Sequence, residues 1–495
     1  MAGSASAQAV DDRLVPRGSV RASVWPSFHA WDEAFGAGGG RVPLGRDVSA
    51  GSAFEIFPGA SMLSTGLRSL SGDDDYAPNM GAVEGRVSHD VTRIDLGLHL
   101  GVTDWWTIGV TMPRIKNRAV IDMVFVPDTI GGDMGISPYV TAPNEVGAFL
   151  SELQTAASAA VARADALCGA NDPQCAAATE LAQRASTFDA SMRGVYTATP
   201  FFPLEGSMIA GSLALAVENL DMALTSAGLA GIQTPLLLAG SRATEADLET
   251  LPTRFDRLGY AAPLQTRTGL WAWGDVEIST YARVLRLQES NRSIEVIAGG
   301  LLRLGTGTAA SPDVPLDRGA GDGQTDVEGR LAAHGVSGPV SLRLGGIYGI
   351  QGSRALTRRF GDPGAVLAPI ETRLTVDWEP GSYKVVEAEP GIRLARALTL
   401  SGTYRYLGRD GDTFRIAGGG AEDPVQLQGG ASVSRHEVGG ALTYDTAEPA
   451  AEAGFRPVRF RVRLITAVAG RGPDMPAGTR VDLGAELFTS LWGGG

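Results

Sequence analysis

The strongest constraint on the fold is a strict alternation of polar and apolar residues in segments of about ten residues. Between 91 and 101, Arg93, Asp95 and His99 share one set of positions, and mostly leucine and isoleucine fill the positions between them. A β-strand points successive side chains to opposite faces, so this pattern predicts a strand with one polar and one apolar face. A tight turn and a second alternating run follow, which together predict an antiparallel hairpin.

The same alternation returns near the middle and the end of the chain, and in each case the charged residues share one face. The polar positions selected in this way are Arg93, Asp95, His99, Asp275, Glu277, Tyr281, Arg283, Arg459, Arg461, Arg463, Asp482 and Glu486. These side chains are our candidates for lining an interior that contains water.

Twelve segments carry the pattern strongly enough to be predicted as strands. They are 19–32, 87–100, 105–126, 271–287, 293–305, 323–334, 339–351, 382–394, 398–408, 435–446, 457–469 and 479–492. Most connections alternate between short and long, as in outer-membrane barrels with short periplasmic turns and long external loops. We therefore expect an all-β fold, a transmembrane antiparallel up-and-down β-barrel of about 12 strands, within a range of 12 to 14.

One long segment, 128–269, interrupts the strands. Its apolar residues recur at helical spacing in three stretches, and it is too long for a loop without structure of its own. We expect a mainly helical insert that acts as a cap or plug, between N-terminal barrel strands at 10–127 and C-terminal barrel strands at 270–495.

The first nine residues end in Ala7-Gln8-Ala9, the small-x-small form of a secretory cleavage site, so 1–9 is interpreted as the end of a signal peptide. Export would place the two cysteines, Cys168 and Cys175, in an oxidising compartment. They lie at the bend between the first two predicted helices, and we expect them to form a disulfide.

Composition excludes several other classes of protein. The net charge is −13 and no long run of basic residues occurs, which argues against nucleic acid as a partner. No apolar stretch reaches the roughly 18 residues of a membrane helix. The five histidines are scattered, so we expect no metal site and no cofactor. Ser434 and His436 form a close serine and histidine pair, but without a nucleophile motif around them we do not expect an enzyme.

Alternation alone does not separate a membrane barrel from a soluble sandwich, because both have one polar and one apolar face. The export signature, the alternating connection lengths and the aromatic residues near strand ends favour the barrel. An arginine facing lipid at the midplane costs roughly 2–4 kcal/mol, so in a barrel Arg459, Arg461 and Arg463 have to face inward. There the charges either line a pore and bias its selectivity or fill the lumen as ion pairs, and both alternatives stay open.

Four short motifs resemble a known family: GDVEISTYARVL (274–285), LLRLGTGTA (301–309), GDGQTDVEGRL (321–331) and LGVTDWWTIGVTMP (100–113). They are similar to outer-membrane transporters for hydrophobic compounds, namely the long-chain fatty-acid transporters and the channel-like relatives named for phenol-degradation pathways. The resemblance covers most of 87–492. The N-terminal hatch of the fatty-acid transporters is not found, and the helical insert is an addition to their pattern.

Together these features predict an outer-membrane channel or transporter for passive or facilitated diffusion of small solutes, hydrophobic ones included. The expected location is the bacterial outer membrane. The expected partners are the lipid and lipopolysaccharide of that membrane, the barrel-assembly machinery and small-molecule solutes. The alternatives are a secreted or surface all-β binding or structural protein and, less favoured, an outer-membrane barrel enzyme.

Overall fold

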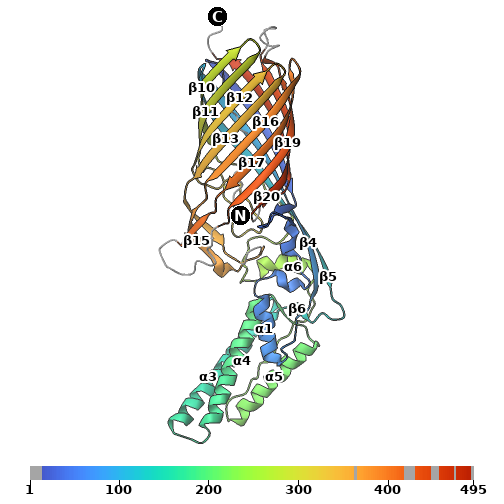
Figure 1. The fold of residues 1–495 in the computed structure, drawn as a ribbon. Helices are drawn as coiled ribbons and strands as arrows, with labels where there is room; N and C mark the ends of the chain where they lie inside the picture. Colours follow the sequence, from blue (N-terminus) through green and yellow to red (C-terminus); the bar gives the residue numbers. More distant parts are fainter. Residues whose placement is uncertain (1–13, 362–364, 417–429, 448–455, 473–474, 492–495) are drawn as a thin grey trace.

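A closed antiparallel barrel of twelve strands dominates the computed structural model, which describes residues 14–361, 365–416, 430–447, 456–472 and 475–491 (Figure 1). Each strand pairs with the next along the chain, and β1 with β22 and β5 with β10 close the wall. The strands are β1 (Ser19–Trp31), β4 (Gly81–Thr103), β5 (Trp106–Pro127), β10 (Glu277–Glu289), β11 (Arg292–Arg303), β12 (Asp326–Ser337), β13 (Val340–Gln351), β16 (Tyr383–Ala395), β17 (Leu398–Arg409), β19 (Val433–Asp445), β20 (Val458–Arg471) and β22 (Thr479–Ser490). The predicted fold class is confirmed, and each of the twelve predicted segments overlaps one of these strands.

The two ends of the barrel differ. At one end, called the short-turn end here, tight turns join β4 to β5, β10 to β11, β12 to β13 and β16 to β17. The start of β1 and the end of β22 lie at the same end, because Ser19 pairs with Ser490. The long connections gather at the opposite end, called the long-loop end. The predicted alternation of short and long connections therefore holds for most of the barrel, and the connections at 446–457 and 472–478 are of intermediate length.

The outer wall of the barrel is apolar. Along β20, Val462 and Leu464 are 52% and 54% exposed, whereas Arg463 between them is 5% exposed. Exposed leucine, isoleucine and valine side chains recur in the same way on the other barrel strands. A continuous apolar surface of this size is rare on soluble monomers and marks a surface that meets lipid or protein. Arg459, Arg461 and Arg463 lie on the inward face of β20.

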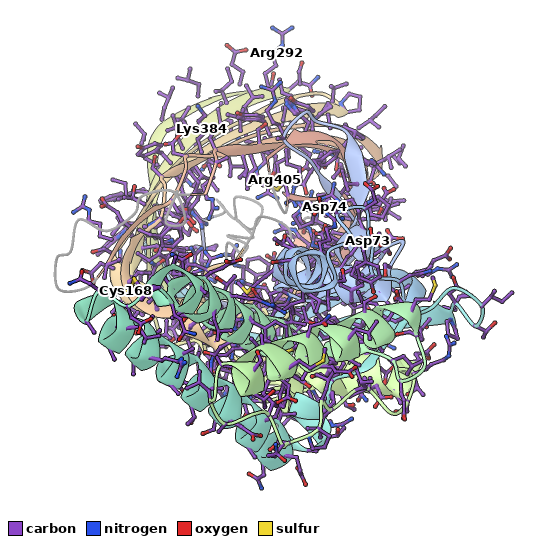
Figure 2. All side chains as sticks on the ribbon, turned by 90° about the horizontal axis from the view of Figure 1, so that it is seen from below. Asp73, Asp74, Cys168, Arg292, Lys384 and Arg405 are labelled. Carbon is purple, nitrogen blue, oxygen red and sulfur yellow. A yellow bond between two sulfur atoms is a disulfide. The ribbon has the colours of Figure 1, made fainter. Side chains whose placement is uncertain are left out.

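A helical domain lies beyond the long-loop end (Figure 1). It contains α1 (Ala60–Ser71), α2 (Pro138–Thr141), α3 (Pro143–Gly169), α4 (Cys175–Ala198), α5 (Met208–Ser226) and α6 (Glu245–Arg254). Viewed along the barrel from this side, the helices lie toward one side of the strand ring (Figure 2). The three predicted helical stripes correspond to α3, α4 and α5. The helices lie outside the barrel rather than inside its lumen, which does not fit a plug.

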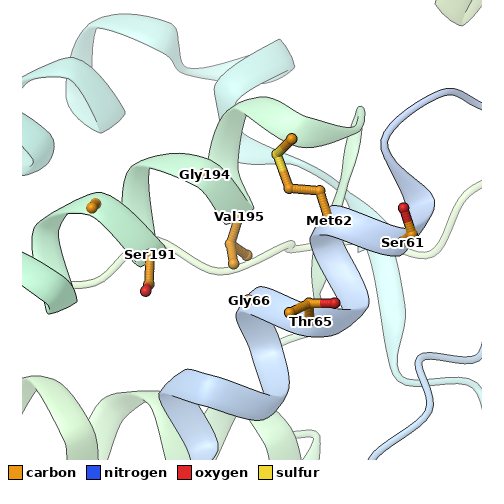
Figure 3. Close-up of a pocket in the computed structure, with 8 residues that line it drawn as sticks. Ser61, Met62, Thr65, Gly66, Ser191, Gly194 and Val195 are labelled. Carbon is orange, nitrogen blue, oxygen red and sulfur yellow. The ribbon is translucent and has the colours of Figure 1, made fainter.

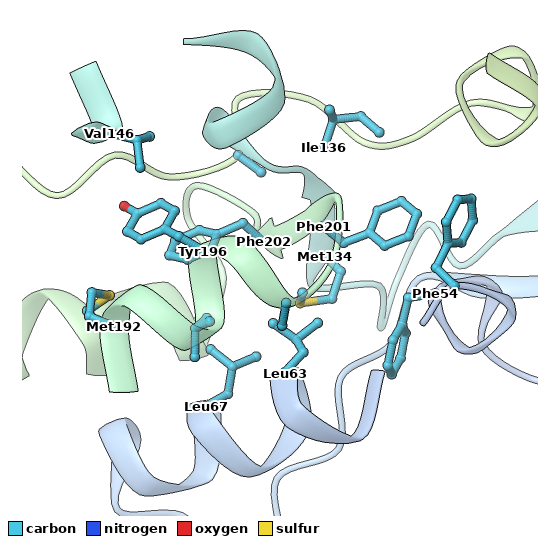
Figure 4. Packing of buried hydrophobic residues seen from close by; sticks show 14 of the residues in the cluster. Phe54, Leu63, Leu67, Met134, Ile136, Val146, Met192, Tyr196, Phe201 and Phe202 are labelled. Carbon is cyan, nitrogen blue, oxygen red and sulfur yellow. The ribbon is translucent and has the colours of Figure 1, made fainter. Parts of the chain in front are cut away.

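The core of the helical domain joins two parts of the chain. Leu63 and Leu67 of α1 pack with Met192 and Tyr196 of α4 in one buried cluster, to which Phe202 also belongs (Figure 4). The rings of Tyr196 and Phe202 stack with centroids 4.1 Å apart. Because α1 comes from the connection between β1 and β4, the domain is larger than the predicted insert, and the sequence analysis missed α1 and α6.

Local signals explain where several of these helices begin. Ser207 caps α5 by accepting a hydrogen bond from the Ala210 amide, and Thr244 forms a capping box with Asp247 at the start of α6. The predicted disulfide is confirmed, since Cys168 and Cys175 are bonded between α3 and α4. Among the described helices, α5 alone is long and apolar enough to cross a membrane by length and composition.

Smaller sheets cover the long-loop end. β2 (Glu33–Phe35), β3 (Arg41–Pro43) and β21 (Met475–Pro476) form one, and β14 (Arg354–Arg359), β15 (Arg373–Glu379) and β18 (Thr413–Ile416) form another. Two short strands, β8 (Arg267–Thr268) and β9 (Ala272–Trp273), pair with β5 beyond its contact with β10. Described parts of the loops at this end therefore form small sheets of their own.

Candidate functional site

The interior of the barrel holds the charged residues that the sequence analysis selected. Buried on the inward face are Asp95, His99, Glu277, Tyr281, Arg459, Arg463, Asp482 and Glu486, and partly buried there are Arg93, Arg283 and Arg461. Asp275 is buried just before β10, where one carboxylate oxygen accepts a hydrogen bond from the Gly307 amide at 2.7 Å. The structure thus brings together residues that are far apart in the sequence.

One ion-pair network centres on Arg303 of β11. Its guanidinium lies 3.3 Å from Glu277, 2.9 Å from Asp326 and 2.9 Å from Glu328. Glu328 also accepts hydrogen bonds from the guanidinium of Arg330, at 2.8 and 2.5 Å. These residues sit on β10, β11 and β12, whose alternating positions all point inward.

This network extends across neighbouring strands. Tyr383 of β16 donates its hydroxyl to Glu328 of β12, with β13 lying between the two strands. Gly349 of β13 leaves the space for this ring, because a Cβ there would lie 2.2 Å from the Tyr383 ring. On the other side, Arg93 of β4 lies 2.7 Å from Asp95 and 3.2 Å from Glu277 of β10. Side chains in the interior therefore contact residues on strands beyond the adjacent one.

A second network joins β20 to β16, although β17 and β19 separate these strands in the wall. Arg461 lies 2.7 Å from Glu389, and Arg463 lies 3.8 Å from Glu387. Arg343 of β13 also approaches both glutamates, at 3.5 and 3.7 Å. Because these pairs bridge non-adjacent strands, they cross part of the lumen and narrow it.

Different contacts lie at the two ends of the interior. At the short-turn end, Glu486 lies 2.7 Å from Arg459 and 3.9 Å from Arg21. Here the chain turns back before β1, so that the buried Val15 donates its amide to the Thr107 hydroxyl at 2.9 Å. At the long-loop end, Arg405 and Arg435 contact Glu437 at 3.0 and 3.1 Å. Figure 2 shows Arg405 inside the strand ring.

An apolar strip runs between these charged groups. The strip residues are inward-facing, buried and in mutual contact, and they come from β12 to β20: Ala332, Ile347, Tyr383, Val385, Leu407, Val433 and Ala467. At the long-loop end the strip meets Phe35 and Met475 of the small sheet that covers the mouth. The lumen wall is thus polar on most strands and apolar along one band.

Other candidate chemistry is sparse. Ser434 and His436 lie on the outer face of β19, and the Tyr404 hydroxyl lies 2.8 Å from His436 Nδ1. In the described part of the chain, no group of three or more His, Cys, Asp or Glu side chains is arranged to hold a metal ion. A shallow cavity of about 470 Å³ lies between α1 and α4, lined by small residues such as Ser61, Gly66 and Ser191 (Figure 3).

Many interior residues were missed by the sequence analysis. They have the same alternation as the residues that were found: Arg21, Arg303, Asp326, Glu328, Arg330, Arg343, Glu387, Glu389, Arg405, Arg435, Glu437 and Arg480. Counting inward positions along every predicted strand would have identified them. The structure places both Asp326 and Glu328 beside Arg303.

No protein-family model matches the chain, and no curated protein matches it. Solved structures similar to it include an outer membrane channel from Pseudomonas putida F1, with 9% identity, TM-score 0.43 and coverage of 97% of this chain and 99% of that one. The CymD monoaromatic hydrocarbon channel has 8% identity, TM-score 0.27 and coverage of 97% and 90%. A Pseudomonas aeruginosa FadL homologue has 7% identity, TM-score 0.25 and coverage of 96% and 90%.

The assignment of the fold rests on the pairing of the chain's own strands, which form a closed ring with an apolar outside and a charged inside. A barrel with these two faces is built to stand in a lipid bilayer. The chain is a transmembrane up-and-down β-barrel of twelve strands with a helical domain at one end.

Proposed function

We propose that this protein is a channel for the diffusion of small solutes across a bacterial outer membrane. The observation that carries the proposal is the inward face of the closed barrel, where charged residues extend from the short-turn end to the long-loop end. Barrels of eight strands are filled by their own side chains, whereas those of sixteen or more enclose open channels. Twelve strands suit a narrow passage whose lining decides what crosses.

The orientation follows from the two ends. Outer-membrane barrels have short turns on the periplasmic side and long loops outside the cell. The short-turn end therefore faces the periplasm, and the helical domain stands on the outer surface. In that position its exposed helices are close to lipopolysaccharide, and we expect lipopolysaccharide and the barrel-assembly machinery to be partners during insertion and residence.

The apolar strip bears on the kind of solute. An apolar group that moves through the lumen would contact Val385, Leu407 and Val433 on the wall. The charged residues on the other strands would keep the rest of the passage hydrated. Small solutes with a hydrophobic part are therefore included in the proposal. The bridging pairs Arg461–Glu389 and Arg463–Glu387 set the narrow part of the route.

Liposome swelling tests the proposal. Purified protein is reconstituted into liposomes, and entry of sugars of increasing size is followed by light scattering. We expect entry of the smallest sugars only, and faster entry for the double variant Glu389→Gln/Arg461→Gln, which removes both charges of a bridging pair and nearly preserves its volume. Glu180→Gln, on the exposed face of α4, is the matched control and should leave all rates unchanged.

Correct folding is checked in each sample by gel mobility in SDS before and after boiling, since closed barrels resist SDS until they are heated. Folded protein that admits no solute, in both the original chain and the double variant, would contradict the proposal. It would instead favour a structural or binding role for the barrel.

A further inference from the structure

A cluster of arginines stands at the long-loop end of the lumen. Arg435 of β19 and Arg405 of β17 contact the two oxygens of Glu437, at 3.1 and 3.0 Å. Arg480 of β22 lies 3.2 Å from Asp482. The register of β1 and β22 places Arg480 directly opposite His29. Four strands therefore present basic groups to one region of the interior.

Among the described residues, this region holds fewer carboxylates than guanidinium groups. Asp482 is held mainly by Arg463, whose Nη2 and Nε atoms lie 2.7 and 2.9 Å from the same carboxylate oxygen. Glu437 is shared by Arg405 and Arg435. Four guanidinium groups thus share three carboxylates among the described residues, since Glu387 lies 3.8 Å from Arg463 and is the cross-strand partner of Arg405. The cluster carries an excess of positive charge.

Several guanidinium N–H donors in the cluster make no hydrogen bond with any described residue. Arg480 is 8% exposed, and its Nε and Nη2 atoms have no hydrogen-bond partner among the described residues, because the contact with Asp482 lacks hydrogen-bond geometry. Arg435 is 6% exposed, and its Nε atom is unbonded in the same sense. The indole N–H of Trp31, whose ring lies 4.5 Å from that of His29, is also buried without an acceptor in the described part of the chain. Buried charged donors without acceptors are costly, so they mark a place where an acceptor belongs.

We propose that Arg435 and Arg480 form a binding site for the anionic group of a solute, a carboxylate or a phosphate. Guanidinium groups bind both through paired N–H donors in a planar fork. This inference rests on the proposed channel function, because the cluster lies at the outer end of the lumen. The site would concentrate anionic solutes at the mouth of the channel.

The surroundings favour a small organic acid over inorganic phosphate. Val433 lies two residues before Arg435 on the same face of β19, and Leu407 is the cross-strand partner of Arg435. Both belong to the apolar strip. When the arginines bind the carboxylate of an organic acid, its apolar group would contact these side chains. Inorganic phosphate has no apolar group that could make this contact.

The test measures binding directly. Benzoate and inorganic phosphate are titrated by calorimetry into the full-length protein in detergent, each at constant ionic strength. We expect benzoate to bind more tightly than phosphate, and the variants Arg435→Gln and Arg480→Gln each to weaken benzoate binding at least tenfold. The conservative variant Arg480→Lys, which keeps the charge but loses the planar fork, should show an intermediate loss.

Arg283→Gln is the matched control. Arg283 is also inside the barrel, but it pairs with Glu295 at 2.6 Å near the short-turn end. Removing this charge should not change benzoate binding, and the heat-dependent gel shift confirms that each variant is folded. Phosphate binding equal to that of benzoate would keep the site but make it a general anion site.

Absence of benzoate and phosphate binding to the folded original chain would overturn the inference, as would equal losses in Arg283→Gln and Arg480→Gln. The two proposals can fail separately. Anion binding without solute passage in liposomes would retain the site and reject the channel, whereas passage without anion binding would retain the channel and reject the site.

Discussion

Replacing Glu328 by glutamine should strongly destabilise the barrel. The Glu328 side chain is fully buried, and it accepts hydrogen bonds from Arg303, Arg330 and Tyr383. Arg303 would keep Glu277 and Asp326 as partners. Arg330 would lose the one carboxylate that lies within 4 Å of it among the described residues. Breaking a buried pair in this way costs about 3–5 kcal/mol, because a charge is left buried without compensation.

A matched substitution in the same lumen should cost far less. Glu295 pairs with Arg283 at 2.6 Å, but their side chains are 30% and 21% exposed, so water can replace the lost partner. Exposed ion pairs contribute roughly 0–1 kcal/mol, and Glu295→Gln should fall in that range. The difference between the two variants therefore reports how dry the interior is around Glu328.

The free energy of unfolding is measured by urea titration in lipid vesicles, followed by tryptophan fluorescence. The double variant Glu328→Gln/Arg330→Gln should recover most of the loss, because it removes both partners of the pair. If Glu328→Gln and Glu295→Gln lower the stability equally, the reasoning is refuted, and the interior is wet throughout.

Three further results are expected. Val462→Arg, on the lipid-facing side beside the inward Arg461 and Arg463, should cost roughly 2–4 kcal/mol in the same urea titration, whereas Val462→Leu should cost little. Cys168→Ser with Cys175→Ser should loosen the tip of the hairpin of α3 and α4, by at most about 2.5 kcal/mol for so short a loop, and speed its proteolysis without changing the gel shift of the barrel. Hydrogen bonds from Thr234, and then from the Gln233 amide, lower the pKa of the Glu152 carboxyl in α3. The contact between α3 and residues 233–234 is therefore complete above the ordinary pKa of glutamate, and it is lost as the pH falls through the lowered pKa. Hydrogen exchange at Gln233 and Thr234 should therefore rise on acidification, and Glu152→Gln should abolish the dependence.

The barrel could be predicted from the sequence because its strongest determinant is local. A strand that separates lipid from a polar lumen has to alternate, and the alternation in 91–101 and 457–469 is visible without any knowledge of the partner strands. The inward direction of Arg459, Arg461 and Arg463 followed from the cost of placing arginine in lipid. The disulfide could be predicted for a similar reason, because its two cysteines flank one bend between two helices.

The contacts inside the lumen could not be predicted in the same way. Arg461 meets Glu389 from a position 72 residues away, with two strands between them in the wall. Such pairs depend on the tilt and register of the closed barrel, which the alternation does not specify. The helix α1 was missed for another reason: its apolar face is short, and its burial depends on α4, which lies more than a hundred residues later.

Single-channel recording in planar lipid bilayers tests the central claim most directly. The account predicts that correctly folded protein, identified by its heat-dependent gel shift, produces discrete conductance steps in potassium chloride. The double variant Glu389→Gln/Arg461→Gln should enlarge these steps. Under a salt gradient, Arg480→Gln should move the reversal potential toward cation selectivity. A bilayer current that stays at baseline with both the folded original chain and the folded Glu389→Gln/Arg461→Gln variant would contradict the account.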